Sequence, residues 1–203
     1  MQETAALKKR KAALASALQD SDRRVREAAA AALERLESLA EFSGLAGLLK
    51  TGSREQQVRA IYALEQIASP EIYDSLVEAL SSRDQDVRGA ALQVLGRKKN
   101  PKMLKYMVRH LKDPHPAVRV HAAEALGHFS DRRLVPYLSA LLVEEDEALV
   151  TSAVRSLAAI GDPAAEVDLL RLLEAASPAI KAAAAEALGF LQVEPEAGSP
   201  TPE

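Results

Sequence analysis

The sequence predicts an all-α fold, an α-solenoid (α-α superhelix) of six two-helix repeats with a period of 31 residues. Three observations predict it. Leucine recurs every 31 residues without a shift, alanine stands four residues before each of these leucines, and an aliphatic residue stands eight before in five of the six repeats. The leucine column is Leu33, Leu64, Leu95, Leu126, Leu157 and Leu188. Because a two-helix unit cannot bury its apolar side alone, the repeats must stack on one another.

The second helix of each repeat carries the leucine and alanine columns. Spacings of four and eight residues follow the 3.6-residue period, so these columns lie on one face. Eleven residues before each leucine stand Asp22, Ser53, Asp84, His115, Asp146 and Ser177, of which all but the histidine suit a helix N-cap. We expect second helices over residues 23–36, 54–67, 85–97, 116–129, 147–160 and 178–191.

The first helix of each repeat has its own capping residues, five positions after the leucine of the preceding repeat. They are Ser38, Ser69, Asn100, Asp131 and Asp162. We expect first helices over residues 4–19, 39–50, 70–81, 101–112, 132–143 and 163–174. Their inward positions are Leu14, Leu18, Leu45, Leu49, Leu76, Leu80, Met107, Leu111, Leu138, Leu142, Leu169 and Leu173. Pro136 lies inside its helix and is expected to bend it slightly.

Composition excludes several classes of protein. The 203 residues are 48% hydrophobic but only 3% aromatic, with no Cys and no Trp, so the core must consist of Ala, Leu and Val. Without Cys there is no disulfide framework and no thiolate metal site. With 27% charged residues and no apolar run near about 18 residues, the sequence predicts no membrane span. The net charge of −3 gives no general reason to expect nucleic-acid binding.

The two ends of the chain differ from the repeats in composition. Lys8–Lys11 precede an Ala-rich stretch that is too short and too interrupted for a secretory signal, so we interpret the chain as cytoplasmic. Residues 194–203 are rich in Pro, Glu and small residues, which is typical of a disordered tail. We therefore expect a single solenoid domain over residues 1–193 and a disordered C-terminal tail over 194–203.

Several strings resemble HEAT repeats of the phycobilisome-lyase (PBS lyase) type. They are Asp86–Ala91 (DVRGAA), Ala117–Arg119 (AVR) leading to Ala125–Gly127 (ALG), Ile160–Ala164 (IGDPA) and Ala183–Gly189 (AAAEALG). The resemblance covers residues 1–192. It implies a scaffold that holds other proteins, or alternatively a chromophore-handling protein of the bilin-lyase kind.

Two other activities of similar proteins are disfavoured by the residues themselves. The relatives that hydroxylate deoxyhypusine carry His-Glu dipeptides as iron ligands. The four histidines here are followed instead by Leu111, Pro116, Ala122 and Phe129, so we expect no metal and no cofactor. The relatives that excise bases need a basic groove with aromatic residues, whereas this chain has three Phe, four Tyr and an acidic balance.

The periodicity also predicts which residues face a partner. Positions six and two before the leucine, and two after it, lie opposite the alanine column on each second helix, with positions five before and one after at the edges of this side. Second helices line the concave groove of such solenoids. Tyr62 is notable as an aromatic residue with a polar tip on this side. The predicted partner-binding groove is Arg59, Tyr62, Gln66, Gln93, Arg97, Glu124, His128 and Arg155.

Three further sets of charged residues stand out in the sequence. Lys98, Lys102, Lys105 and Arg109 form a basic patch at three- and four-residue steps. Arg26, Arg88 and Arg119 follow the aliphatic column. In similar repeats such an arginine bonds loop carboxylates and carbonyls of the adjacent repeat, and we expect that role here rather than the binding of an anionic partner. His115, His121 and His128 are too widely spaced to converge on a metal, and we expect them to be solvated groove residues.

Charge is unevenly distributed along the chain. Residues 1–142 hold 23 Lys and Arg against 17 Asp and Glu, whereas residues 143–203 hold 3 against 12. This polarity permits weak head-to-tail self-association of a chain that we expect to be monomeric. The sequence as a whole predicts a non-enzymatic protein–protein interaction scaffold that binds another protein in the concave groove, with no nucleic acid and no membrane as partner.

Overall fold

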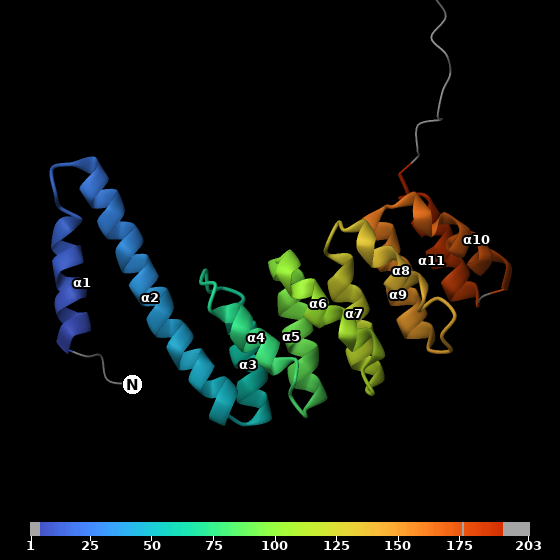
Figure 1. Cartoon of the computed structure of the whole chain (residues 1–203), viewed down its shortest axis with the longest axis horizontal. Coiled ribbons are helices and arrows are strands. Elements are labelled where there is room, and N and C mark those ends of the chain that lie inside the picture. The colour runs from blue at the N-terminus through green and yellow to red at the C-terminus, as the bar shows by residue number, and fades with distance from the viewer. Residues whose placement is uncertain (1–4, 176, 193–203) are drawn as a thin grey trace, which may run out of the picture. The chain divides into compact units, whose positions relative to one another are not determined.

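The computed structural model describes residues 5–175 and 177–192, and within these ranges the only regular elements are helices (Figure 1). The chain forms two compact units that meet between Ala91 and Leu92, inside one helix. They are called the N-terminal unit and the C-terminal unit below. The predicted tail, residues 194–203, lies outside the described residues.

The N-terminal unit contains α1 to α4 and the first half of α5. Its helices are α1 (Ala5–Ala17), α2 (Arg23–Thr51), α3 (Arg54–Leu64), α4 (Ile72–Ala79) and α5 (Gln85–Lys98).

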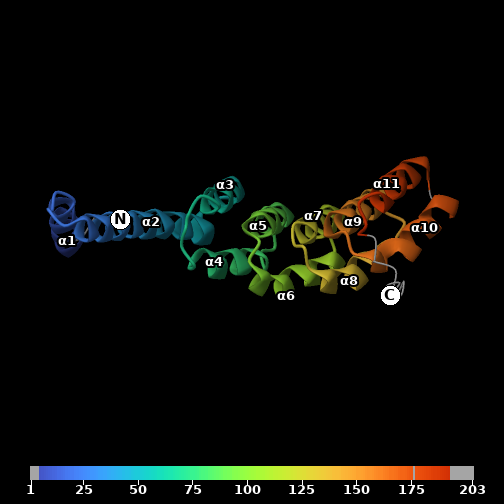
Figure 2. The same cartoon turned by 90° about the horizontal axis from the view of Figure 1, so that it is seen from above.

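The C-terminal unit contains the second half of α5 and the helices α6 to α11, with four 3-10 turns. The helices are α6 (Leu104–Met107), α7 (Pro116–Gly127), α8 (Val135–Ser139), α9 (Glu147–Ile160), α10 (Glu166–Ala175) and α11 (Pro178–Leu188). The 3-10 turns are Pro101–Met103, Val108–Lys112, Arg132–Leu134 and Pro163–Ala165. Figure 2 shows α7, α9 and α11 in one row and α6, α8 and α10 in another, as two-helix repeats require.

The second helices agree closely with the sequence pattern. α9 has its predicted bounds, and α3, α5, α7 and α11 begin where predicted and end within three residues of the predicted end. The backbone N–H groups at the helix starts donate to the predicted caps Asp22, Ser53, Asp84, Asp146 and Ser177. His115 does not cap its helix, and Asp113 accepts from the His115 backbone N–H at 2.9 Å.

The first helices of the C-terminal unit are less regular than predicted. Each begins as a 3-10 turn, capped by Asn100, Asp131 or Asp162 through its side chain. Our prediction for Pro136 was wrong, because α8 starts at Val135 and Pro136 stands in its first turn, where no N–H is needed. Ser69 is not a helix cap either, since its hydroxyl donates to Glu71.

The largest departure from the prediction is α2. The helices expected over residues 23–36 and 39–50 are one continuous helix of 29 residues. Ser38 therefore lies inside a helix and caps nothing. Leu39 follows it, whereas Ser69, Asn100 and Asp162 are each followed by a proline that cannot continue a helix. Asp131 has no proline after it, but there Gly127 ends the preceding helix. The surrounding residues, Glu34 to Phe42, offer no other breaker.

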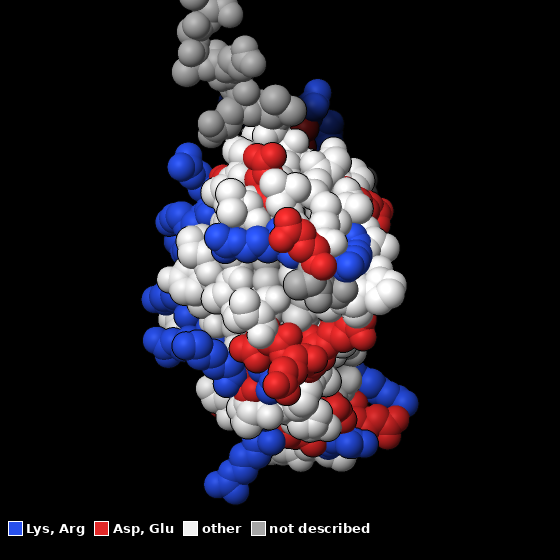
Figure 3. All heavy atoms as spheres, turned by 90° about the vertical axis from the view of Figure 1, so that its right-hand side faces the viewer, with Lys and Arg blue, Asp and Glu red and all other residues white. Residues whose placement is uncertain are grey.

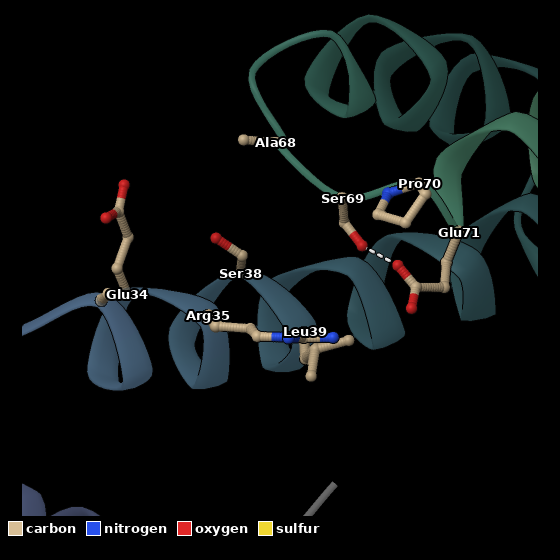
Figure 4. A pocket seen from close by; sticks show the side chains of 9 residues that line it. Glu34, Arg35, Ser38, Leu39, Ala68, Ser69, Pro70 and Glu71 are labelled. Carbon is tan, nitrogen blue, oxygen red and sulfur yellow. Dashed lines mark hydrogen bonds between the residues drawn. The ribbon is translucent and has the colours of Figure 1, made fainter. Parts of the chain in front are cut away.

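The continuous helix leaves the first repeat poorly buried. Ala29 is the one buried residue of α2, and α1 has none. Leu14, Leu18, Leu45 and Leu49 are only half-buried, so the prediction that they are core residues was wrong. Figure 4 shows the hollow that remains, about 400 Å³ between α2 and the turn at Ser69–Glu71.

In the C-terminal unit consecutive second helices pack with their backbones close together. A methyl group on Gly96 would lie 2.8 Å from the Ala125 Cα, and one on Gly127 would lie 2.5 Å from the Ser156 Oγ. The close approach lets the buried Ser156 hydroxyl donate to the Ala123 carbonyl oxygen at 2.8 Å. The small residues of the repeat thus set the spacing between stacked helices.

Substitution of Leu39 by proline tests the continuity of α2. A proline at this position removes a backbone donor and clashes with the preceding turn, so we expect a loss of stability of about 3 kcal/mol and lower helical ellipticity. Leu39→Ala should cost about 1 kcal/mol or less, because Leu39 is largely at the surface. Circular dichroism with urea unfolding measures both, and full tolerance of the proline would show a break at Ser38.

Glycine-to-alanine substitutions test the helix spacing. Gly96→Ala places a methyl group against the Ala125 backbone, which cannot move away freely, and should destabilise the fold by about 1–3 kcal/mol. Gly47→Ala is the matched control, since nothing lies within 4 Å of its new methyl group. That variant should gain about 0.5–1 kcal/mol through helix propensity. Urea unfolding of the two variants should therefore give shifts of opposite sign.

Candidate functional site

The predicted groove residues of the C-terminal unit include a hydrogen-bonded cluster across α5 and α7. The Gln93 Nε2 lies 3.2 Å from the His121 Nδ1, and the same nitrogen lies 3.5 Å from the Glu124 Oε2. The Nδ1 accepts from Gln93 when it carries no proton and donates to Glu124 when it does, so the two hydrogen bonds are alternatives. Gln93 and Glu124 were predicted to belong to one surface, and the structure brings them together through His121. Our site prediction left His121 out, although its position five residues before Leu126 puts it at the edge of the same face.

The remaining groove residues of this unit are exposed on the second helices. Arg97 lies near the end of α5, His128 directly follows α7, and Arg155 lies in α9. The structure thus places each of them at the surface of the row formed by α7, α9 and α11, or on α5 beside it. Together with the Gln93–His121–Glu124 cluster they offer hydrogen-bonding groups of both charges.

Arg59, Tyr62 and Gln66 belong to the N-terminal unit. Arg59 donates to the Glu55 Oε1 at 2.6 Å, and Tyr62 is 39% exposed on α3. Gln66 is exposed in the loop that follows α3, because this helix ends at Leu64. We predicted that these three residues line one groove with the residues of the C-terminal unit, and this stays a prediction.

An apolar hollow lies between α9 and α11, on the same row of second helices. It has a volume of about 320 Å³ and is lined by Arg155, Ala158, Ala159, Ala183, Glu186, Ala187 and Phe190. Phe190 is 64% exposed at its edge. The sequence pattern placed this residue two positions after Leu188, on the groove side, but our predicted site ended at Arg155. A large exposed aromatic in a chain with few rings was the signal for including it.

The basic patch lies mainly on the first helices of the C-terminal unit. Lys102 is in the 3-10 turn before α6, Lys105 in α6 and Arg109 in the 3-10 turn after it, and all three are exposed. Lys98 is half-buried at the end of α5. The Lys105 ammonium lies 4.8 Å from the centre of the Tyr106 ring, a cation–π contact.

The arginines that follow the aliphatic column bond loop carbonyl groups, as predicted, but these carbonyls belong to the arginine's own repeat and not to the adjacent one. Arg26 donates to the carbonyl oxygens of Asp20 and Ser21, at 2.7 and 2.9 Å. Arg88 donates to the Ser82 carbonyl oxygen at 2.9 Å. Arg119 donates to the Asp113 carbonyl oxygen at 3.1 Å and also lies 3.7 Å from the Asp146 carboxylate of the next repeat. Each arginine therefore stabilises the loop before its own helix by hydrogen bonds to the backbone.

The histidines do not form a shared site. His110 lies 3.2 Å from the buried Asp113 carboxylate, and His121 belongs to the cluster with Gln93. Across residues 5–175 and 177–192, no three His, Asp or Glu side chains are grouped so that they could hold a metal ion. None of the helices described there is both long enough and apolar enough to cross a membrane.

One carboxylate beside the basic patch is stabilised in its charged form. Asp131 accepts from the Arg133 guanidinium at 2.6 and 2.9 Å and from the Arg133 backbone N–H at 3.0 Å. The guanidinium hydrogen bonds hold the pKa of the Asp131 carboxyl below its usual 3.8. Arg133 is thus neutralised locally, and Lys102, Lys105 and Arg109 carry the positive charge of this surface.

Comparison with known families agrees with the repeat architecture. The model for HEAT repeats matches three overlapping stretches, residues 42–115, 73–158 and 109–189. The chain belongs to the HEAT-repeat family. No curated protein matches the sequence.

Solved structures show the same α-solenoid fold. The complex of CpcE and CpcF of phycocyanin lyase from Nostoc sp. PCC7120 matches with a TM-score of 0.63 and 24% identity, over 72% of this chain and 63% of the other. A designed armadillo repeat protein in complex with the peptide (KR)4 matches with a TM-score of 0.56 and 18% identity, over 89% and 98%. Kap95p, in a structure with RanGDP, matches with a TM-score of 0.56 and 16% identity. The match covers 90% of this chain and 28% of Kap95p.

The titration of Asp131 gives a prediction with a defined sign. Since its folded pKa lies below the unfolded value, its pairing with Arg133 stabilises the fold above pH 3.8 and this contribution is lost as pH falls through the folded pKa. Arg133→Gln should raise the Asp131 pKa toward 3.8, measured by carbon NMR of the carboxyl. Arg132→Gln is the control and should leave it unchanged. Equal shifts in both variants would contradict the assignment to Arg133.

Proposed function

We propose that this HEAT-repeat protein is a non-enzymatic scaffold that binds a partner protein through the exposed side of its second helices. The observation that carries the proposal is the hollow between α9 and α11. Its walls are alanine side chains, its edge is Phe190, and Arg155 and Glu186 stand beside it with opposite charges. An apolar side chain of a partner fits such a site, and the two charges can orient its backbone or polar groups.

The neighbouring cluster extends this surface along the C-terminal unit. Gln93, His121 and Glu124 offer hydrogen-bond donors and acceptors close to one another on α5 and α7. The combination of an apolar hollow and polar groups around it is the usual composition of a protein interface.

The comparisons support a protein as partner at the level of fold. The designed armadillo protein is in complex with a peptide, Kap95p binds RanGDP, and CpcE is in complex with CpcF. The similarity to CpcE and CpcF also favours a second candidate, a chromophore-handling protein of the lyase kind. Addition of a bilin to the purified protein distinguishes the two, since a shifted visible absorption band would favour the second.

Site-specific photocrosslinking tests the scaffold proposal. Benzoylphenylalanine in place of Phe190 should form an adduct of one defined mass with a protein in an extract of the native host. Val167 on α10 is a matched control position, with 59% exposure against 64% for Phe190. We expect no such adduct from Val167, because it lies on a first helix.

A second substitution shows whether the adduct reports a specific site. Arg155→Glu, combined with the crosslinker at position 190, should reduce the yield of the adduct at least several-fold, because it reverses a charge at the edge of the hollow. Equal adducts at positions 190 and 167, or an unchanged yield with Arg155→Glu, would refute binding at this surface.

A further inference from the structure

The C-terminal unit has a second hollow, formed by two successive first helices. It has a volume of about 680 Å³ and is lined by Pro101, Lys102, Leu104, Lys105, Val108, Asp131, Arg133, Leu134 and Tyr137. Leu104 and Leu134 are buried beneath it, whereas Tyr137 on α8 is 52% exposed. The hollow therefore has an apolar floor and an aromatic side chain that a bound group can contact.

The rim of this hollow is positively charged. Lys102 and Lys105 line it, and within the described part of the chain no carboxylate lies within 4.0 Å of either ammonium group. Asp131 also lines the hollow, but its charge is taken up by Arg133, 2.6 Å away. Arg109 and Arg132 are exposed in the 3-10 turns Val108–Lys112 and Arg132–Leu134 of the same row. The net charge around the hollow is therefore positive.

This surface is separate from the one in the proposed function. It lies on the row of α6 and α8, whereas the hollow beside Phe190 lies between α9 and α11 (Figure 2). Figure 3 shows Lys and Arg side chains gathered along the left edge of the view and Asp and Glu toward its centre. The two hollows differ in their linings, since Lys102 and Lys105 stand at one and Arg155 and Glu186 at the other.

We propose that this cationic hollow docks an acidic segment of a partner protein. An apolar or aromatic side chain of the segment enters the hollow against Leu104 and Tyr137, and carboxylates on either side pair with Lys102 and Lys105. Charge complementarity favours an acidic chain, and the apolar floor favours a peptide over a polyphosphate, since phosphates gain nothing from it. The Asp131 carboxylate at the wall also opposes a phosphate backbone more than a peptide that can place a neutral residue there.

Fluorescence anisotropy with a labelled peptide tests this proposal. The probe is a short peptide with Phe-Leu between two pairs of Glu. We expect saturable binding that weakens strongly between about 0.05 and about 0.5 M NaCl, since the rim charges are exposed to solvent. The double variant Lys102→Glu with Lys105→Glu should bind at least tenfold more weakly, and Tyr137→Ala should weaken binding several-fold.

Matched controls separate docking from general charge attraction. Lys50→Glu with Arg83→Glu makes the same change in net charge at exposed positions of the N-terminal unit and should bind the probe like the wild type. A probe with Ser in place of Phe-Leu, or with Lys in place of Glu, should bind at least tenfold more weakly. Circular dichroism confirms that each variant is folded.

Several results would overturn the proposal. If the probe with Ser in place of Phe-Leu binds as tightly as the original probe, no side chain enters the hollow. If both double variants lose affinity equally, the probe responds only to the net charge of the protein. Displacement of the probe by a single-stranded oligonucleotide at lower concentration than by unlabelled peptide would assign the surface to nucleic acid. A salt-sensitive dimer in sedimentation, lost in the Lys102→Glu, Lys105→Glu variant, would make a second copy of this chain the occupant. None of these results bears on the photocrosslinking at Phe190, which involves another surface.

Discussion

The close approach of consecutive second helices is the constraint on which the C-terminal unit depends. At Gly96 and at Gly127 there is no room for a methyl group, because Ala125 and Ser156 of the next helix lie within 3 Å of where it would be. Backbones this close let a serine hydroxyl bond a carbonyl oxygen of the neighbouring helix, as Ser156 does with Ala123. The stack is held by small residues at van der Waals contact and by these bonds, which explains how a chain with 3% aromatic residues packs a core.

Loop capping complements this packing. Arg88 and Arg119 each donate to carbonyl oxygens of the loop before their own helix, and aspartates or serines cap the helix starts. Buried loop carbonyls need such partners, because an unpaired polar group away from water costs about 1–3 kcal/mol. The first repeat has the arginine and the cap at Asp22 but lacks the break at Ser38, and its leucines are only half-buried. Correct capping of a helix is therefore not enough to bury the leucines of a repeat when the chain does not turn between its two helices.

The sequence predicted the features that repeat and missed those that depend on one residue. The 31-residue period predicts the second helices, their caps and the structural arginines. Each of these features depends only on residues within about twelve positions of one another, through helical spacing and local hydrogen bonds. The fusion of α2 depends on Leu39 standing where three other repeats have proline, and a six-repeat average hides that difference. The same holds for the candidate sites. Exposure at Arg155 and His128 follows from the period, whereas the hollows beside Phe190 and Tyr137 arise from how neighbouring side chains fill space.

The two rows of helices in the C-terminal unit differ in how their charges are compensated. On the second-helix row, His121 and Glu124 contact each other and Arg155 stands beside Glu186 at one hollow, so charges of both signs are close together. On the first-helix row the one carboxylate at the hollow, Asp131, is already paired with Arg133, and Lys102 and Lys105 remain for an incoming anion. Since compensated pairs add specificity and uncompensated cations add long-range attraction, the first-helix row is suited to rapid encounter and the second-helix row to selection. The two proposed sites lie on different rows, so occupation of one would leave the other open to a second protein segment.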